Sequence, residues 1–170
     1  LRHNAKKYNL DKTRVASYGE SAGASASLWL ATIDDQADPN SKDPVLRESS
    51  RLIAAGGFWV QATFDVIQWP KILGLPEDKT PYWGMVKSSK AQLGEKRFNE
   101  LRKDMDMLGN MDKNDPPMHF SPGKEGQGVH SQRFVDVLEK RAKEAGANLI
   151  IKAGRESLMQ FLTGKLNAKK

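Results

Sequence analysis

Short apolar runs alternate along the chain with longer segments of helical spacing. Strand-like runs are found at 13–18, 51–61, 117–121 and 148–152, and helix-like segments at 24–33, 89–107, 131–145 and 156–166. The clearest helix is 131–145, in which Phe134, Leu138 and Ala142 recur at four-residue spacing and Gly146 supplies a stop signal. Strands alternating with helices predict an α/β fold with a mostly parallel sheet of about four strands, flanked by helices.

The segments between these runs are polar or punctuated by proline. We expect the end of a helix at 1–8, a short helix or turn at 44–50, and loops at 34–43, 109–115 and 121–128. Residues 64–84 are rich in proline and aromatic residues, which predicts an irregular excursion with short helices. We therefore interpret residues 1–170 as one domain with a cap-like insertion at about 64–114. Trp69, Tyr82 and Trp83 line a pocket there or pack the insertion on the sheet, and packing is the commoner use of large aromatics.

The strongest chemical signal is the G-x-S-x-G sequence Gly19-Glu20-Ser21-Ala22-Gly23, placed between a predicted strand and a predicted helix. A serine on such a sharp turn projects from the carboxyl end of the sheet as a nucleophile, and a purely structural glycine turn is the alternative. Glycine is expected two residues before and two residues after Ser21, at positions 19 and 23. Together with Glu20 these residues would form the sharp turn known as a nucleophile elbow. The Ala22 amide, at the helix amino terminus, is positioned to donate to an oxyanion.

The surrounding sequence resembles the α/β-hydrolase superfamily, in particular its esterase/lipase (carboxylesterase-like) branch. The resemblance rests on residues 1–26, on Asp115-Pro116-Pro117 and on residues 128–134, and it is loose between 64 and 114. It implies that Ser21 attacks an ester carbonyl, that a histidine takes its proton and that a carboxylate orients the histidine, in the chain order Ser, Asp/Glu, His. It also implies that the histidine follows the last strand.

The sequence departs from that pattern at the position of the general base. The last predicted strand is followed by Ala153-Gly154-Arg155-Glu156, and arginine cannot accept a proton. His130 is the best substitute base, with capping of the helix that begins near Ser131 as the alternative interpretation. The other two histidines are expected elsewhere: His119 within a strand and His3 on the surface.

Two residues compete for the role of the acid. Asp115 precedes a strand and should lie at the amino-terminal edge of the sheet, whereas Glu125 follows that strand, in the loop where a triad acid belongs. We therefore favour Glu125, which keeps the order Ser, Glu, His, with a simple solvated glutamate as the alternative.

The resemblance also implies parts that these residues do not contain. The family's oxyanion loop, of histidine-glycine-glycine type, would precede Leu1, so we expect the chain to be the C-terminal part of such a domain. The strand that leads into Ser21 would then expose an edge. An exposed edge has three possible explanations. The chain is truncated, it pairs there with a missing N-terminal segment or another chain, or it forms a homodimer through that edge.

The amino-acid composition excludes or disfavours several other classes of site and function. The 170 residues include no cysteine and three histidines, which excludes disulfides, thiolate zinc sites and a cysteine nucleophile and disfavours a metal site. The net charge of +6, from 27 Lys and Arg against 21 Asp and Glu, is scattered, so nucleic-acid binding is disfavoured. No apolar stretch reaches the ~20 residues of a membrane span, and no cofactor motif is found. The sequence does not predict a cellular compartment.

The sequence leaves three candidate functions. The first is a serine esterase that cleaves small carboxylic esters through an acyl-enzyme on Ser21. The second is a catalytically inactive hydrolase-fold module that binds a ligand or partner, because no histidine follows the last strand. The third, a basic nucleic-acid binder, is the least supported.

Overall fold

Four parallel strands form the centre of the molecule. The computed structural model describes residues 1–79, 82–126 and 128–168. The strands are β1 (Ala16–Glu20), β2 (Ala54–Phe58), β3 (Met118–Phe120) and β4 (Leu149–Ile151). They lie side by side in chain order, β1-β2-β3-β4, and every pair is parallel. Their carboxyl ends therefore share one edge of the sheet, as the predicted α/β architecture requires.

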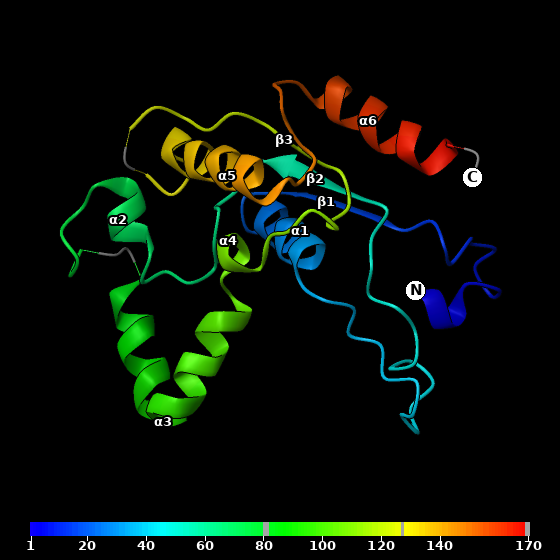
Figure 1. The fold of residues 1–170 in the computed structure, drawn as a ribbon, viewed down its shortest axis with the longest axis horizontal. Helices are drawn as coiled ribbons and strands as arrows, with labels where there is room; N and C mark the ends of the chain where they lie inside the picture. Colours follow the sequence, from blue (N-terminus) through cyan, green and yellow to red (C-terminus); the bar gives the residue numbers. More distant parts are fainter. Residues whose placement is uncertain (80–81, 127, 169–170) are drawn as a thin grey trace.

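Helices cover both faces of this sheet (Figure 1). The described helices of the whole chain are η1 (Arg2–Asn4), α1 (Ala22–Thr32), α2 (Trp69–Leu73), α3 (Trp83–Asp104), α4 (Met107–Asn110), α5 (Gln132–Ala145) and α6 (Arg155–Asn167). Helices α1 and α5 pack on one face and α6 on the other, so the sheet is the middle of three layers. Because the strands follow one another in a single direction, right-handed crossovers place the connecting helices α1 and α5 on the same face. Helix α6 follows the last strand and packs on the other face.

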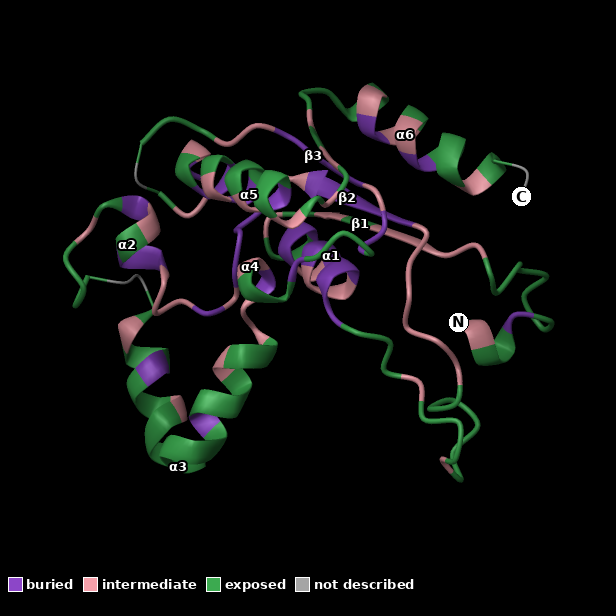
Figure 2. Ribbon diagram, viewed as in Figure 1, coloured by how far each residue is buried: buried purple, intermediate pink, exposed green. Residues whose placement is uncertain are grey.

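The main hydrophobic core lies between the sheet and the α1–α5 layer (Figure 2). Leu28 of α1, Phe120 of β3 and Phe134 of α5 are fully buried there. A smaller cluster, made of Ala54, Leu158 and Leu162, joins α6 to the opposite face. Burying a side chain of this size stabilises the fold by about 1.5–3 kcal/mol, so the larger cluster holds α1 firmly against the strands.

Small residues allow α1 to approach the sheet closely. A Cβ atom added at Gly57 of β2 would lie 2.5 Å from the Cβ of Ala24 in α1. Non-bonded contacts of a Cβ atom under 3.0 Å essentially never occur, so any larger residue at Gly57 would push the helix outward. This contact fixes the first turn of α1, directly after Ser21, against the carboxyl end of β2.

Several predicted boundaries differ from those observed. The predicted strand 51–61 is shorter because Trp59, directly after β2, has a positive φ of 56° that ends the strand. The predicted helix 89–107 begins earlier, at Trp83, and is kinked at Gly94, whose φ of 72° is non-helical. Residues 1–8 hold a short 3-10 helix and turns, not the end of an α-helix, and 44–50 form turns. The first strand runs on to Glu20, so it leads directly into Ser21.

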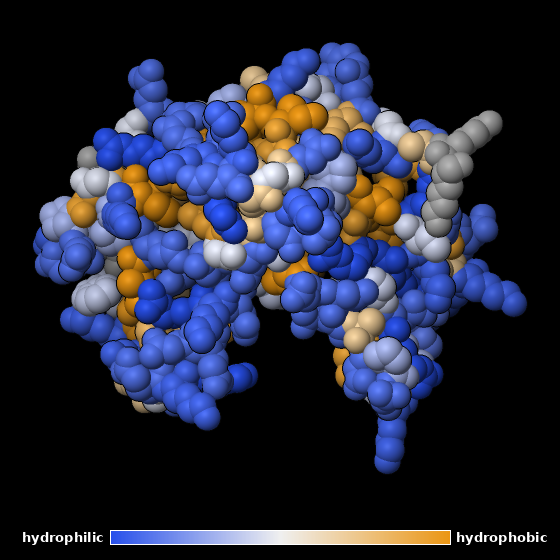
Figure 3. Space-filling view, viewed as in Figure 1, coloured by the Kyte–Doolittle hydropathy of each residue, from blue (hydrophilic) through white to orange (hydrophobic). Residues whose placement is uncertain are grey.

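The segment between β2 and β3 contains α2, α3 and α4, and α3 stands away from the sheet (Figure 1). Figure 3 shows a largely hydrophilic surface over α3. Trp69 is buried and its ring packs edge-on against Tyr82 and Phe134, at centroid distances of 5.4 and 5.0 Å. Trp69 therefore serves packing between this segment and α5. The designation of 64–114 as a cap stays a prediction.

Strand β1 forms one edge of the sheet, and the Tyr18 side chain on it is 55% exposed. In the part of the chain that the structure describes, no helix has the length and apolar character needed to cross a membrane.

Candidate active site

Ser21 is the single residue between β1 and α1, and its backbone is strained. Its φ of 52° and ψ of −118° lie in a region that non-glycine residues rarely adopt. Holding a residue there costs about 1–3 kcal/mol, which the surrounding structure must offset. Two backbone bonds fix the turn: the Ser21 N–H donates to the Phe58 carbonyl at 2.9 Å, and the Ser21 carbonyl accepts from the Ser25 N–H at 3.0 Å. The sharp turn points the hydroxyl out of the carboxyl edge of the sheet.

The two flanking glycines differ in what they permit. A Cβ at Gly19 would lie 2.4 Å from the backbone carbon of Gly23, so position 19 must be glycine. A Cβ at Gly23 would meet nothing within 4 Å, although the sequence argument expects glycine there as well. Ala22 follows Ser21 as the first residue of α1, where backbone N–H groups have no partner within the helix. Glu20 is exposed at the end of β1.

The Ser21 hydroxyl oxygen lies 2.8 Å from Nε2 of His130, a residue 109 positions away in the sequence. His130 ends a loop closed by two backbone bonds of 2.7 Å, from the Lys124 N–H to the His130 carbonyl and from the Gln132 N–H to the Lys124 carbonyl. The cap of α5 is Ser131, whose hydroxyl accepts from the Arg133 N–H at 3.2 Å. The helix therefore does not need His130 as its cap, and the imidazole is directed to Ser21.

An aromatic ring and a cation flank the imidazole. The Trp59 ring lies against that of His130, with centroids 5.7 Å apart, and the Lys124 ammonium lies 4.3 Å from the Trp59 centroid. The Trp59 N–H donates to the Ser121 hydroxyl at 3.0 Å, which ties the end of β2 to the end of β3. Sequence reasoning did not identify Trp59 or Lys124, because their proximity to His130 depends on strand order and not on local pattern.

The two candidate acids occupy different places. Glu125 is exposed, and it makes no hydrogen bond or ion pair to His130 or to any other residue that the structure describes. Asp115 is buried at the amino-terminal edge of the sheet, before β3, where its carboxylate accepts from the Asp112 N–H at 2.9 Å. Burial raises the pKa of Asp115 to about 6. The structure thus brings Ser21 and His130 together but leaves Glu125 solvated, and its role as the acid stays a prediction.

The start of α6, which follows β4, supplies a cation to the same edge of the sheet. Arg155, the first residue of α6, lies over the Phe58 ring, with its guanidinium carbon 5.4 Å from the centroid. His119 is buried in β3 on the α6 side, and its Nε2 lies 3.0 Å from the Ser157 hydroxyl. Burial lowers the pKa of His119, which favours its neutral form. Neither residue contacts Ser21, so His130 is the histidine that the fold presents to it.

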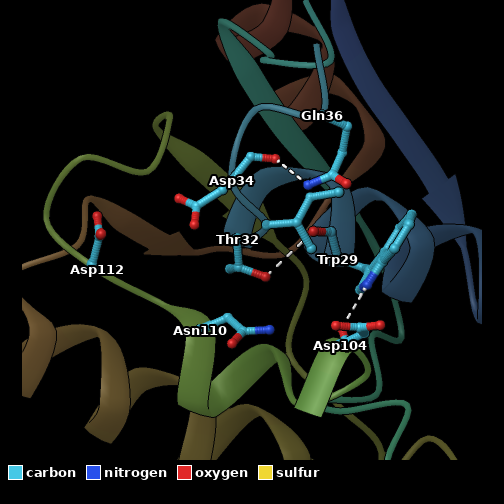
Figure 4. Close-up of a pocket in the computed structure, with 8 residues that line it drawn as sticks. Trp29, Thr32, Asp34, Gln36, Asp104, Asn110 and Asp112 are labelled. Carbon is cyan, nitrogen blue, oxygen red and sulfur yellow. Dashed lines mark hydrogen bonds between the residues drawn. The ribbon is translucent and has the colours of Figure 1, made fainter. Parts of the chain in front are cut away.

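A separate cavity of about 340 Å³ lies at the opposite end of α1 (Figure 4). Asp34, Asp104 and Asp112 line it together with Trp29, whose indole N–H donates to the Asp104 carbonyl at 2.8 Å. Ser21 and His130 do not line this cavity. Among residues 1–79, 82–126 and 128–168, no group of three or more His, Asp or Glu side chains is arranged to hold a metal ion.

Comparison with known proteins places this fold among solved esterases. No family model and no curated protein matches the sequence. Three solved structures match over 97–99% of this chain: an acetyl ester-xyloside bifunctional hydrolase from Caldicellulosiruptor lactoaceticus (TM-score 0.62, 21% identity), a truncated carbohydrate esterase from gut microbiota (0.68, 16%) and a propionate-bound esterase from the planctomycete Thermogutta terrifontis (0.64, 17%). This chain covers 57%, 65% and 63% of those chains. At these identities the likeness concerns the fold alone, an α/β fold with a parallel sheet flanked by helices.

Proposed function

We propose that this protein is a serine ester hydrolase in which Ser21 is the nucleophile and His130 the general base. The observation that carries the proposal is the 2.8 Å contact between the Ser21 hydroxyl and His130 Nε2, made from a strained turn between a strand and a helix. A nucleophile and a base within hydrogen-bond distance are the essential elements of acyl transfer by serine. On this proposal, residues Gly19, Glu20, Ser21, Ala22 and Gly23 form a nucleophile elbow.

The chemistry follows from these positions. The Ser21 oxygen attacks the ester carbonyl carbon while His130 Nε2 takes the hydroxyl proton, and the Ala22 N–H donates to the oxygen that becomes negative. When the tetrahedral intermediate collapses, the ester C–O bond breaks and the alcohol leaves with the proton from His130. Water, deprotonated by His130, then attacks the acyl-enzyme and releases the carboxylic acid. The Trp59 ring lies beside the imidazole, with ring centroids 5.7 Å apart.

Small carboxylic esters are the substrate class that we propose. Support comes from the names of the structural neighbours, which include an acetyl ester-xyloside bifunctional hydrolase, a carbohydrate esterase and an esterase bound to propionate. Ser21 and His130 are both half-buried. Because the pair is half-buried, the Ser21 oxygen remains accessible to the acyl carbon of a short ester.

A second candidate function is a hydrolase-fold module that binds a ligand without cleaving it. It is favoured by the absence of a described carboxylate bonded to His130 and by Arg155 at the start of α6, directly after the loop that follows β4. Without an orienting carboxylate, a serine–histidine pair loses part of its catalytic power.

Hydrolysis of p-nitrophenyl acetate and labelling by a fluorophosphonate probe distinguish the two functions. We expect labelling of wild-type protein at one site, complete loss of labelling in Ser21→Ala, and a fall in kcat of about 10²–10⁴-fold in His130→Gln. Ser27→Ala, which removes a buried hydroxyl from the same helix, is the matched control and should label normally. Equal hydrolysis by wild type and Ser21→Ala would overturn the proposal, and absent labelling of wild type would favour the binding module.

A further inference from the structure

Gln61 is a buried polar residue located three positions after β2, and its side chain is fully engaged. Its Oε1 accepts a hydrogen bond from the Ser25 hydroxyl at 2.6 Å. Its Nε2 donates to two carbonyls, that of Val129 at 2.9 Å and that of Trp59 at 3.1 Å. Its own N–H donates to the Ser25 hydroxyl at 2.9 Å. A residue that is 5% exposed and has every side-chain polar atom paired is held in one orientation.

The partners of Gln61 adjoin both members of the Ser21–His130 pair. Ser25 is fully buried one turn after Ser21. Its N–H donates to the Ser21 carbonyl at 3.0 Å, and its hydroxyl oxygen lies 3.3 Å from the same carbonyl while its hydrogen is directed to Gln61. Val129 immediately precedes His130. One buried amide therefore connects the helix that carries the serine to the loop that carries the histidine. The third partner, Trp59, packs against the His130 ring.

We propose that Gln61 is a positioning residue, which sets the distance between Ser21 and His130 by joining Ser25 to the Val129 carbonyl. This inference rests on the proposed function, because it assigns Gln61 to the same reaction. The loop that ends at His130 is closed by its own backbone bonds, so its shape does not depend on Gln61. Gln61 links this loop to α1 through Ser25 and Val129, and catalytic groups misplaced by about 1 Å lose about 10²-fold in rate.

Only a side-chain amide provides the hydrogen-bonding groups that this position needs. It supplies one acceptor for the Ser25 hydroxyl and two N–H donors for the two carbonyls. Glutamate has the same shape but would direct an oxygen toward those carbonyls, and methionine retains the approximate volume without any hydrogen bond. Both substitutions are therefore expected to release the Val129 carbonyl and leave the loop folded.

The test compares Gln61→Met and Ser25→Ala with the control Ser27→Ala in the complete chain. Ser27 is a suitable control because it is buried on the same helix and bonds to Ser17 at 2.8 Å, away from His130. We expect the rate constant for fluorophosphonate labelling of Ser21 to fall at least about 10-fold in Gln61→Met, about 3–10-fold in Ser25→Ala and less than about 2-fold in Ser27→Ala. We expect kcat for p-nitrophenyl acetate to fall while KM stays within about 2-fold.

Labelling of Gln61→Met at the wild-type rate would overturn the inference and leave the proposed function standing. If Gln61→Met does not fold, Ser25→Ala becomes the deciding variant, and its labelling at the rate of Ser27→Ala overturns the inference.

Ring ¹⁵N NMR gives a readout that does not require activity, and the signals can be assigned because the sequence has only three histidines. The ring signal that moves in Ser21→Ala identifies His130. If wild type neither labels nor hydrolyses, the proposed function fails, and an unchanged His130 signal in Gln61→Met overturns the positioning role, whereas a displaced signal supports it.

Discussion

Gly19 and Gly23 face each other across the turn at Ser21, and only one of them lacks space for a side chain. A Cβ on Gly19 would lie 2.4 Å from the backbone carbon of Gly23, whereas a Cβ on Gly23 would meet nothing within 4 Å. The two glycines of the G-x-S-x-G sequence therefore have different physical roles. The first permits close contact between β1 and α1, and the second is a helical residue of α1 without a steric requirement.

This asymmetry predicts opposite effects of alanine at the two positions. Gly19→Ala should destabilise the protein by at least about 2–3 kcal/mol, because backbone has to move to relieve the clash. Gly23→Ala should raise stability by about 0.5–1 kcal/mol, because alanine favours the helix. Urea denaturation of both variants beside wild type measures the difference, and equal destabilisation by the two would contradict the described packing.

The exposed position of Glu125 predicts a small catalytic effect. Because Glu125 makes no contact with His130 among the described residues, Glu125→Gln should lower kcat less than about 3-fold. The measurement is p-nitrophenyl acetate hydrolysis, with His130→Gln in parallel as the reference for loss of the base. A fall of about 100-fold would show that the carboxylate turns toward His130 during turnover and acts as the triad acid.

Asp115 predicts a loss of stability as the pH rises. Its pKa is raised by burial from 3.8 to about 6, so between these values the folded protein holds a proton that the unfolded chain releases. The contribution of Asp115 to stability is therefore fully present below about pH 4, and at most about 3 kcal/mol is lost as the pH rises through 6.

The Asp115→Asn variant isolates this contribution. Asparagine can still accept from the Asp112 N–H but does not ionise. The variant should be more stable than wild type at about pH 7.5, and its advantage should shrink toward about pH 4. Urea midpoints at the two pH values measure it, and an advantage that is the same at both would contradict the assignment.

The ion pair between Asp65 and Arg102 predicts how the segment between β2 and β3 is anchored. The Asp65 carboxylate is buried and accepts from Arg102 Nη2 at 2.9 Å and from Nε at 3.1 Å. Asp65→Asn should destabilise the protein by about 2–4 kcal/mol, because the guanidinium loses its charged partner. Arg97→Gln, which removes an exposed pair with Glu100, is the control and should leave the urea midpoint unchanged. Equal midpoints for Asp65→Asn and wild type would refute this anchoring.

Local patterns predicted the elements, while contacts distant in sequence determined the site. The α5 helix and its stop at Gly146 follow from four-residue spacing and a glycine in the left-handed conformation. The early start of α3 at Trp83 does not follow from the sequence pattern, because Gly84 and the nearby proline and aromatic residues are typical of an irregular segment. Gln61 could be noticed in the sequence as a polar residue ending an apolar run, but its link to Ser25 and Val129 depends on how β2, α1 and a distant loop meet.

The order of the strands in the sheet has a consequence for synthesis. Because the spatial order β1-β2-β3-β4 equals the order in the chain, each new strand leaving the ribosome finds its partner already present. The turn at Ser21 needs only β1, α1 and the Phe58 carbonyl, whereas His130 emerges after the whole intervening segment and β3. A growing chain therefore carries Ser21 long before it carries His130, and on the proposed function the hydroxyl has no partner for its proton until translation has passed β3.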